Sequence, residues 1–344
     1  EVLLLSRLQH FVGTNRDENI ELRKLSAELC SEFEKAFPDR TDKLTEAEVL
    51  NFAENIFKWR KLVACYDLIQ AYATDPIIPM ILKARYVAYE HGTIRDIPFE
   101  NTPVGRLTAL AYAKAEAVFI TNPDCLMAAK KLGLTNYKYV PHVIDSKYYS
   151  QATVPNPVRK VLDSKYVLCP ARHDFATKGT DIAIRGFADF AKSNSQISLV
   201  MTNWGVDVKR SIDLVEQLGI SDRVKLIPPM SIRELISATQ SAEAVIDQFF
   251  GYFGGIAPTA LASGVPLIIN VDFRKYDWCH DSPPPHFNAT TPEEVSLALQ
   301  QALACDRTAL LQASLIWMKK NYHYSSVIKA HLETYAELGF VKST

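Results

Sequence analysis

Two positively charged residues, Arg172 and Lys178, stand in the segment 170–181. The segment follows a strand-like run, Tyr166 to Cys169, and precedes an expected helix over 180–193. Arginine offers a bidentate fork to phosphate oxygens, lysine offers a point charge, and the start of a helix favours an anion. The pattern therefore predicts a site for a phosphate or diphosphate. On spacing alone, however, two solvated cations on a surface loop are the simpler interpretation.

A second candidate loop follows the strand-like run 244–246 and precedes an expected helix over 258–263. Three glycines in this loop would let the backbone approach a ligand closely and present N–H groups to it. A glycine-rich loop can also serve only as a turn, so the composition of the loop does not by itself define a site. The candidate residues in this loop are Asp247, Gln248, Gly251, Gly254 and Gly255.

Short strands alternating with helices must position both loops. In the N-terminal half, residues 1–60 are expected to be mostly helical; strands follow over 66–72, 84–90, 117–120 and 137–140, and helices over 75–82, 104–115 and 125–132. In the C-terminal half, strands are expected over 166–169, 198–201, 224–227, 244–246 and 267–269. The helices expected there are 180–193, 208–218, 231–241, 258–263, 292–304 and a long stretch over 307–338. This alternation predicts an α/β protein with two doubly wound parallel sheets, whose ligands bind beyond the carboxyl ends of the strands.

The length of 344 residues favours two domains. The polar segment Ser150 to Pro157, with two prolines, is the best linker candidate. We therefore expect an N-terminal domain over 1–150, a C-terminal domain over 151–320, and a final helix over 321–344.

Composition excludes several classes of protein. Lys and Arg number 38 against 39 Asp and Glu, so the basic excess typical of a nucleic-acid-binding protein is absent. Six scattered cysteines indicate reduced thiols and a cytoplasmic protein. No stretch reaches the ~18–20 apolar residues of a membrane span, and Glu1 does not begin a signal sequence, although peripheral contact with the inner face of a membrane stays open. His280 and His286 are separated by prolines and have no close third ligand, so no metal site is predicted.

Taken together, these segments resemble glycosyltransferase family 4, a group of retaining enzymes with the GT-B fold. The resemblance covers roughly residues 60–340 and is strongest over 166–300. In the C-terminal half it is carried by Arg172…Lys178-Gly179…Asp181 and by Phe253-Gly254…Ala260-Leu261-Ala262-Ser263-Gly264-Val265-Pro266. In the N-terminal half it is carried by His91-Gly92-Thr93-Ile94-Arg95 and Val140-Pro141-His142-Val143-Ile144-Asp145.

The resemblance implies two Rossmann-like domains with a cleft between them and a C-terminal helix that crosses back. It implies transfer of a sugar from a nucleoside-diphosphate sugar, with UDP or GDP, to a hydroxyl of a glycan, lipid or other glycoconjugate, without a metal or other cofactor. Arg172 and Lys178 would bind the donor diphosphate, and His91 would lie beside the donor sugar. The loop Gly251–Gly255, which includes Phe253, would wrap sugar and phosphate, and Met230 and Ser231 would border the base.

The sequence departs from the family at its paired glutamates, which fall here on Gly251 and Thr259. Some relatives carry an Asp-Gln pair at the strand end instead, as Asp247-Gln248 does here. A threonine in place of the ribose-binding glutamate forms a weaker hydrogen bond. An inactive sugar-nucleotide-binding or scaffolding relative is therefore the alternative. Another enzyme of the same fold, an epimerase or a phosphorylase, fits less well. Nothing resembles a pyridoxal-phosphate lysine site, and the family resemblance disfavours the epimerases.

The N-terminal domain departs from the family as well. Glu1 to Leu5 is strand-like, but the loop expected to face the acceptor, Phe11 to Asn15, has a single glycine. We therefore expect a reduced or truncated acceptor domain.

Overall fold

The structure is a computed structural model that describes residues 16–251, 253 and 255–340. The chain divides into two compact units, one formed by residues up to Pro141 together with those from Ala330, the other by His142–Lys329. The sequence placed this division after residue 150 and the return to the first unit at residue 321. The strand expected at 1–5 and the loop at 11–15 lie outside the described residues.

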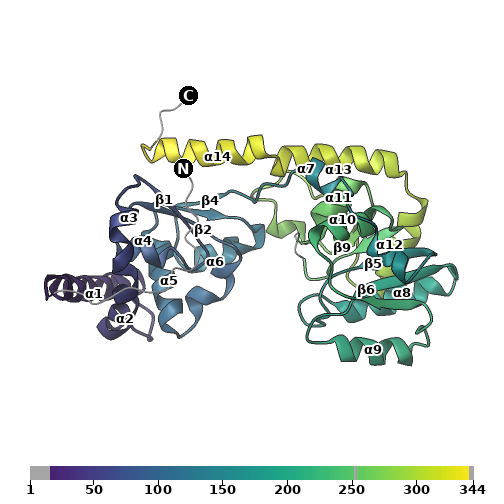
Figure 1. Ribbon diagram of the computed structural model, residues 1–344, viewed down its shortest axis with the longest axis horizontal. Helices are drawn as coiled ribbons and strands as arrows, with labels where there is room; N and C mark the ends of the chain where they lie inside the picture. Colours follow the sequence, from purple (N-terminus) through teal and green to yellow (C-terminus); the bar gives the residue numbers. More distant parts are fainter. Residues whose placement is uncertain (1–15, 252, 254, 341–344) are drawn as a thin grey trace. The chain divides into compact units, whose positions relative to one another are not determined.

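The first unit is built on a parallel sheet of four described strands, β1 (Ile69–Tyr72), β2 (Tyr86–Tyr89), β3 (Ala117–Ile120) and β4 (Tyr137–Tyr139), in the order β1-β2-β3-β4 (Figure 1). Their connections contain α4 (Ile77–Ile81), α5 (Pro103–Lys114) and α6 (Leu126–Lys131), as the alternating pattern predicts. Every residue of β2 and β3 is buried, which is why these strands read as continuous apolar runs rather than alternating ones.

Different helices cover the two faces of this sheet. Tyr86 Oη donates a hydrogen bond of 2.6 Å to the carbonyl of Ala111 on α5, so α5 lies on the Tyr86 face. On the opposite face, His331 of α14 (Tyr324–Glu337) stacks on Tyr89 with ring centroids 5.6 Å apart. Residues from Ala330 onward therefore belong to the first unit, although α14 begins in the second.

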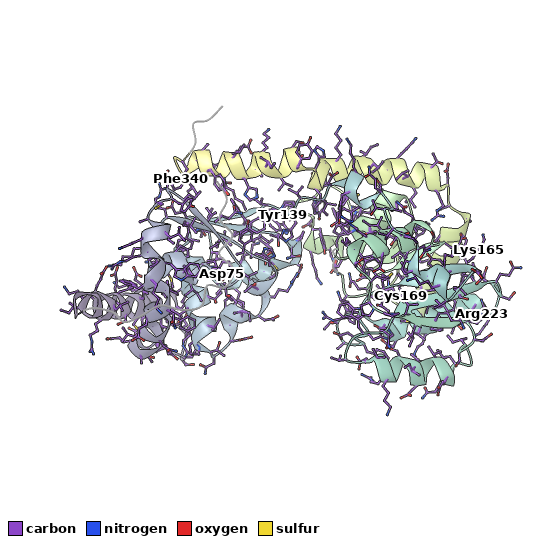
Figure 2. All side chains as sticks on the ribbon, viewed as in Figure 1. Asp75, Tyr139, Lys165, Cys169, Arg223 and Phe340 are labelled. Atoms are coloured by element: carbon purple, nitrogen blue, oxygen red, sulfur yellow. The ribbon has the colours of Figure 1, made fainter. Side chains whose placement is uncertain are left out.

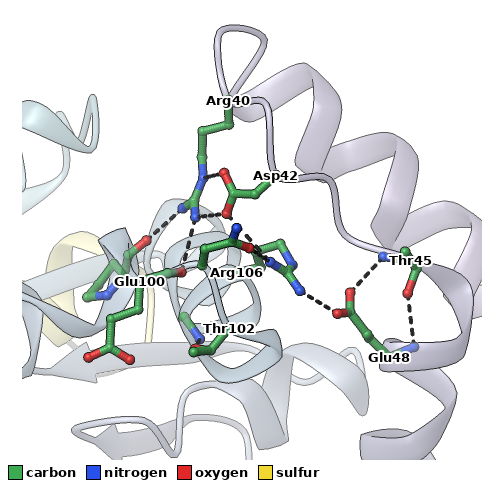
Figure 3. A network of polar contacts seen from close by, with 10 residues as sticks. Arg40, Asp42, Thr45, Glu48, Glu100, Thr102 and Arg106 are labelled. Atoms are coloured by element: carbon green, nitrogen blue, oxygen red, sulfur yellow. Dashed lines mark hydrogen bonds and ion pairs between the residues drawn. The ribbon is translucent and has the colours of Figure 1, made fainter.

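Among the described residues, the α-helices that precede the sheet are α1 (Arg16–Ala36), α2 (Glu46–Ile56) and α3 (Arg60–Val63). A capping box formed by Thr45 and Glu48 starts α2. A network of polar contacts ties the start of α2 to α5 (Figure 3). In it the buried guanidinium of Arg106 donates to Asn101 Oδ1 at 2.6 Å and to Glu48, and Arg40 donates to Asp42 Oδ1 at 3.0 Å.

The described residues of the second unit form a six-stranded parallel sheet in the order β10-β9-β8-β5-β6-β7. Lys165 and Cys169 mark the two ends of β5 (Figure 2). The strand order reverses between β8 and β5, which makes the carboxyl ends of these two strands the place where ligands bind in open α/β sheets. Its strands are β5 (Lys165–Cys169), β6 (Ile197–Thr202), β7 (Val224–Ile227), β8 (Ala244–Ile246), β9 (Leu267–Ile269) and β10 (Phe287–Asn288).

Helices cover both faces of this sheet because its strands carry apolar residues toward both faces. Val167 and Cys169 pack toward one apolar cluster, which contains residues of α8, α9 and α12. Tyr166 and Leu168 pack toward another, with residues of α10, α11 and α13. The helices are α7 (Ser146–Tyr149), α8 (Thr180–Ala191), α9 (Val208–Gln217), α10 (Ile232–Gln240), α11 (Ala257–Ser263), α12 (Pro292–Ala304) and α13 (Arg307–Tyr322).

The long helical stretch expected over 307–338 is two helices. His323, between α13 and α14, has φ −65° and ψ 143°, an extended conformation that ends the first helix. Strand β10 and helix α7 were not expected, because two and four residues are too few to show a periodic pattern. No helix of the described residues is long and apolar enough to span a lipid bilayer.

Candidate functional site

The loop after β5 holds Arg172 by a local hydrogen-bond network. Arg172 Nε lies 3.2 Å from Asp174 Oδ2, and its Nη2 donates to Thr177 Oγ1 at 3.1 Å. The Thr177 hydroxyl in turn donates to the Asp174 carboxylate. The hydrogen bond from Thr177, followed by contributions that include Arg172, holds the pKa of Asp174 below its usual range. The Arg172 side chain is still 46% exposed, so part of its guanidinium faces solvent and is accessible to a ligand.

Asp174 also shapes the start of α8 through its backbone. Its carbonyl accepts hydrogen bonds from the N–H groups of Lys178 at 2.9 Å and Gly179 at 3.1 Å. Gly179, the residue before the helix, has φ +67°, and a Cβ there would lie 3.1 Å from the Phe249 ring. A glycine is therefore required for the tight turn that places Lys178 immediately before the N-cap of α8.

Asp247 lies beside this loop, at the carboxyl end of β8. β5 and β8 are neighbours, with Leu168 paired to Val245, so the loop after β5 and the residue after β8 share one edge of the sheet. Asp247 is buried, and its Oδ2 has no hydrogen-bond partner. Burial raises the pKa of Asp247 to about 7, against the opposing influence of the Lys178 ammonium. The predicted residues Lys178 and Asp247 are thus electrostatic neighbours.

The next residue, Gln248, organises the loop that follows. Its side-chain oxygen accepts a hydrogen bond of 2.7 Å from Phe250 N–H, and its nitrogen donates to the carbonyl of Asn270 at 3.3 Å. Gly251 has φ +85°, and a Cβ there would lie 3.2 Å from Lys275 Nζ. A third cation, which the sequence pattern did not reveal, therefore lies against this loop.

The other predicted residues of this loop differ in their burial. Phe253 is buried against Trp317 and Tyr322, and its N–H already donates to the Tyr276 hydroxyl. Gly255 has φ +59° and open space around its Cα. Gly254 lies outside the described residues. Thr259 is fully buried, and its Oγ1 has no hydrogen-bond partner, so its hydroxyl does not face solvent.

Met230 and Ser231 form the connection between β7 and α10. Ser231 is the N-cap of α10, and its side chain and N–H pair with Glu234 in a capping box. Met230 is partly buried against the apolar cluster on the α10 face of the sheet. Both residues therefore have structural roles that do not depend on a nucleotide.

His91 belongs to the first unit. Its exposed ring lies 5.4 Å from the ring of Tyr72 and 5.6 Å from that of Tyr89. The preceding residue, Glu90, is fully buried and accepts hydrogen bonds from Thr121 N–H at 2.8 Å and Asn122 N–H at 3.1 Å, and also from Gly92 N–H. His91 lies in the turn after β2, and Glu90 therefore attaches this turn to the residues that follow β3.

Sequence reasoning missed Asp174, Glu90 and Lys275 as supporting residues. Asp174 lies within the motif and two residues from Arg172, so its proximity was a usable signal. Glu90 and Lys275 are brought to their sites by tertiary contacts with distant residues. Among the described residues, no group of three or more His, Cys, Asp or Glu side chains is arranged to hold a metal ion.

No protein-family profile matches the sequence, and no curated protein sequence matches it. Solved structures do match the fold. HepE (Alr3699) of Anabaena, in complex with UDP and glucose, is 17% identical with a TM-score of 0.65, over 82% of this chain and 81% of that one. Sucrose-phosphate synthase of Thermosynechococcus elongatus is 16% identical with a TM-score of 0.62, over 84% of this chain and 77% of that one.

A UDP-forming α,α-trehalose-phosphate synthase of Burkholderia xenovorans matches 96% of this chain and 81% of its own, at 12% identity and a TM-score of 0.62. A match of that extent includes both units. The chain therefore has the GT-B fold, with two Rossmann-like α/β units built on parallel sheets.

Proposed function

We propose that the chain is a glycosyltransferase that moves a sugar from a nucleoside-diphosphate sugar to a hydroxyl acceptor. The observation that carries this proposal is the arrangement at the switch point of the second unit. There Arg172, held by Asp174, and Lys178, two residues before the start of α8, share one sheet edge with the buried carboxyl of Asp247. Bond cleavage in such a donor leaves negative charge on the departing diphosphate, and the two cations, Arg172 and Lys178, are suited to stabilise that charge.

In the proposed reaction, the bond between the anomeric carbon and the diphosphate oxygen breaks. The acceptor oxygen forms the new bond to that carbon, and its proton passes to an oxygen of the departing diphosphate, which is the leaving group. Arg172 binds diphosphate oxygens with the exposed part of its guanidinium, while Lys178 and the N–H groups at the start of α8 add positive potential. Retention of configuration at the anomeric carbon is part of the proposal because the family resemblance implies it.

The proposed donor carries UDP. Structures of similar fold were solved with UDP or UDP-glucose, and this favours UDP over GDP. Asp247, with one buried oxygen that has no partner, is proposed to bind a hydroxyl of the donor sugar. His91 is proposed to contact the same sugar, on the strength of the resemblance. The acceptor class, the cytoplasmic location and contact with a membrane surface stay predictions.

Arg172→Ala and Lys178→Ala test the proposal, with Asp189→Ala as the control. Asp189 forms an exposed ion pair with Lys192 in the same unit, so its loss should leave the donor site intact. UDP and a panel of UDP-sugars should raise the melting temperature of the native protein and of the control, because bound ligand stabilises the folded state. Both site variants should show no such rise in melting temperature. They should also lose most of their activity, measured as UDP released from the donor.

Full activity in both site variants would overturn the proposal. Donor binding without hydrolysis or transfer to any acceptor would contradict catalysis and indicate the inactive, sugar-nucleotide-binding alternative.

A further inference from the structure

An exposed tryptophan lies at the carboxyl edge of the second sheet. All four tryptophans of the chain are described, and Trp204 alone among them is exposed, at 46%. Its indole N–H donates to the carbonyl of Pro170 at 3.4 Å. Trp204 is thus attached to the residue that follows β5. Since its polar group is already engaged, the exposed part of the side chain offers a new partner mainly aromatic surface.

The backbone places Trp204 between two loops of the proposed donor site. Its carbonyl accepts a hydrogen bond of 2.8 Å from His173 N–H, next to Arg172. The preceding Asn203 donates its N–H to the carbonyl of Ile227 at 2.7 Å, at the end of β7. Because β6 lies between β5 and β7, Trp204 stands between the Arg172 loop and the connection 228–231.

Contacts with the loop after β5 fix the backbone of the segment that carries Trp204. Gly205 has φ +118°, and a Cβ there would come within 2.4 Å of the His173 carbonyl oxygen. Asp207 N–H donates to that same oxygen at 3.0 Å, while the Asp207 carboxylate accepts from Phe175 N–H at 2.8 Å. Within the described part of the chain, no aromatic ring packs on the indole and no cation lies over it. A fixed aromatic surface of this kind binds a flat partner with little ordering cost.

We propose that Trp204 is the stacking platform for the base of the donor nucleotide. This inference rests on the proposed function, since a ligand whose diphosphate binds Arg172 has its nucleoside within reach of the neighbouring loops. Stacking accepts any base, so Trp204 contributes to affinity rather than to the choice of base. It acts on the nucleoside part of the ligand, whereas Arg172 acts on the diphosphate.

Intrinsic fluorescence titrations with UDP and with inorganic pyrophosphate separate these two contributions. UDP should quench the tryptophan fluorescence of the native protein. Most of that quenching should be absent in Trp204→Ala. Trp204→Ala should also weaken UDP binding about ten-fold in calorimetry, while its affinity for pyrophosphate stays unchanged. Trp204→Phe, which keeps a ring, should retain most of the affinity. The control is Val206→Ala, because Val206 is 87% exposed on the same loop and lacks a ring.

Each outcome decides a different question. Native affinity for UDP in Trp204→Ala would overturn the stacking role and leave the proposed function intact. An equal loss for UDP and pyrophosphate would also overturn it, because the side chain would then act through the Arg172 loop. If Trp204→Ala does not fold, Trp204→Leu gives the same comparison with an apolar side chain of larger volume. If the native protein binds neither UDP nor pyrophosphate, the proposed function and this inference fail together.

Discussion

The Asp174 carboxylate lies 3.2 Å from Nε of Arg172, and the Asp174 carbonyl accepts the N–H of Lys178 at 2.9 Å. One residue thus orients the Arg172 guanidinium and fixes the backbone at Lys178 in the candidate diphosphate site. Replacing Asp174 by Ala removes the carboxylate but keeps the backbone contact to Lys178. We expect UDP affinity to fall about ten-fold in calorimetry, because Arg172 loses its fixed orientation and must be ordered on binding.

The control for this variant is Asp189→Ala, which breaks an exposed ion pair elsewhere in the same unit. Native affinity in Asp174→Ala would show that the Arg172 orientation does not depend on that carboxylate.

Asp247→Asn should change the pH dependence of stability. The pKa of Asp247 is about 7 in the folded protein, and that of an unfolded aspartate is about 4. The folded state therefore binds the proton more tightly, so this group favours folding below about pH 4 and progressively loses that contribution as the pH rises through 7. The loss is roughly 4 kcal/mol in free energy of unfolding, since one pKa unit corresponds to about 1.4 kcal/mol. Chemical denaturation at several pH values should show a smaller decline from pH 4 to 8 in Asp247→Asn, and parallel curves would contradict the raised pKa.

Gly205→Ala and Gly219→Ala form a matched pair. Both glycines have positive φ, +118° and +68°, so each substitution strains the backbone. A Cβ on Gly205 would also clash with the His173 carbonyl oxygen at 2.4 Å, whereas a Cβ on Gly219 would meet nothing within 4 Å. We expect Gly219→Ala to cost about 1 kcal/mol in free energy of unfolding and Gly205→Ala about 2 kcal/mol more. Equal costs in urea denaturation would exclude the clash.

Arg106→Ala should destabilise the first unit. The Arg106 side chain is 8% exposed and pairs with Glu48 and Asp42. Its loss leaves Glu48 without a partner cation, while Asp42 keeps its ion pair with Arg40. The expected cost is about 3 kcal/mol in free energy of unfolding at neutral pH. Glu28→Ala, which breaks an exposed pair with Lys83, should cost less than about 1 kcal/mol.

The same network should make the stability of the first unit depend on pH in acid. A hydrogen bond from Arg40 lowers the pKa of Asp42, and for Glu48 hydrogen bonds from Arg106 and Thr45 outweigh burial and lower the pKa. Depressed carboxyl pKa values stabilise the fold at pH above about 4, and this contribution is lost as the pH falls through the folded values. The difference between the native protein and Arg106→Ala should therefore shrink in denaturation curves below pH 4. A constant difference would show that the network does not act through these charges.

Much of the second unit could be predicted from local pattern alone. The expected strand 224–227 agrees with β7, and the expected helix 258–263 is one residue shorter than α11. Both elements are short, yet turn signals and apolar runs define their ends locally. The long helical stretch expected over 307–338 is helical but divided, because the backbone becomes extended at His323 between α13 and α14.

The sequence by itself determined that Arg172 and Lys178 flank a tight turn at the start of a helix, because strand, turn and helix signals are local. Only the tertiary structure decided which distant groups join them. The pairing of β8 with β5 brings Asp247 beside Lys178, and the packing of β9 and its following turn brings Lys275 to Gly251. Tertiary packing also made Thr259 a buried residue, because α11 places it in the interior. Strand order and burial depend on long-range packing, so they cannot be predicted from the local sequence around each of these residues.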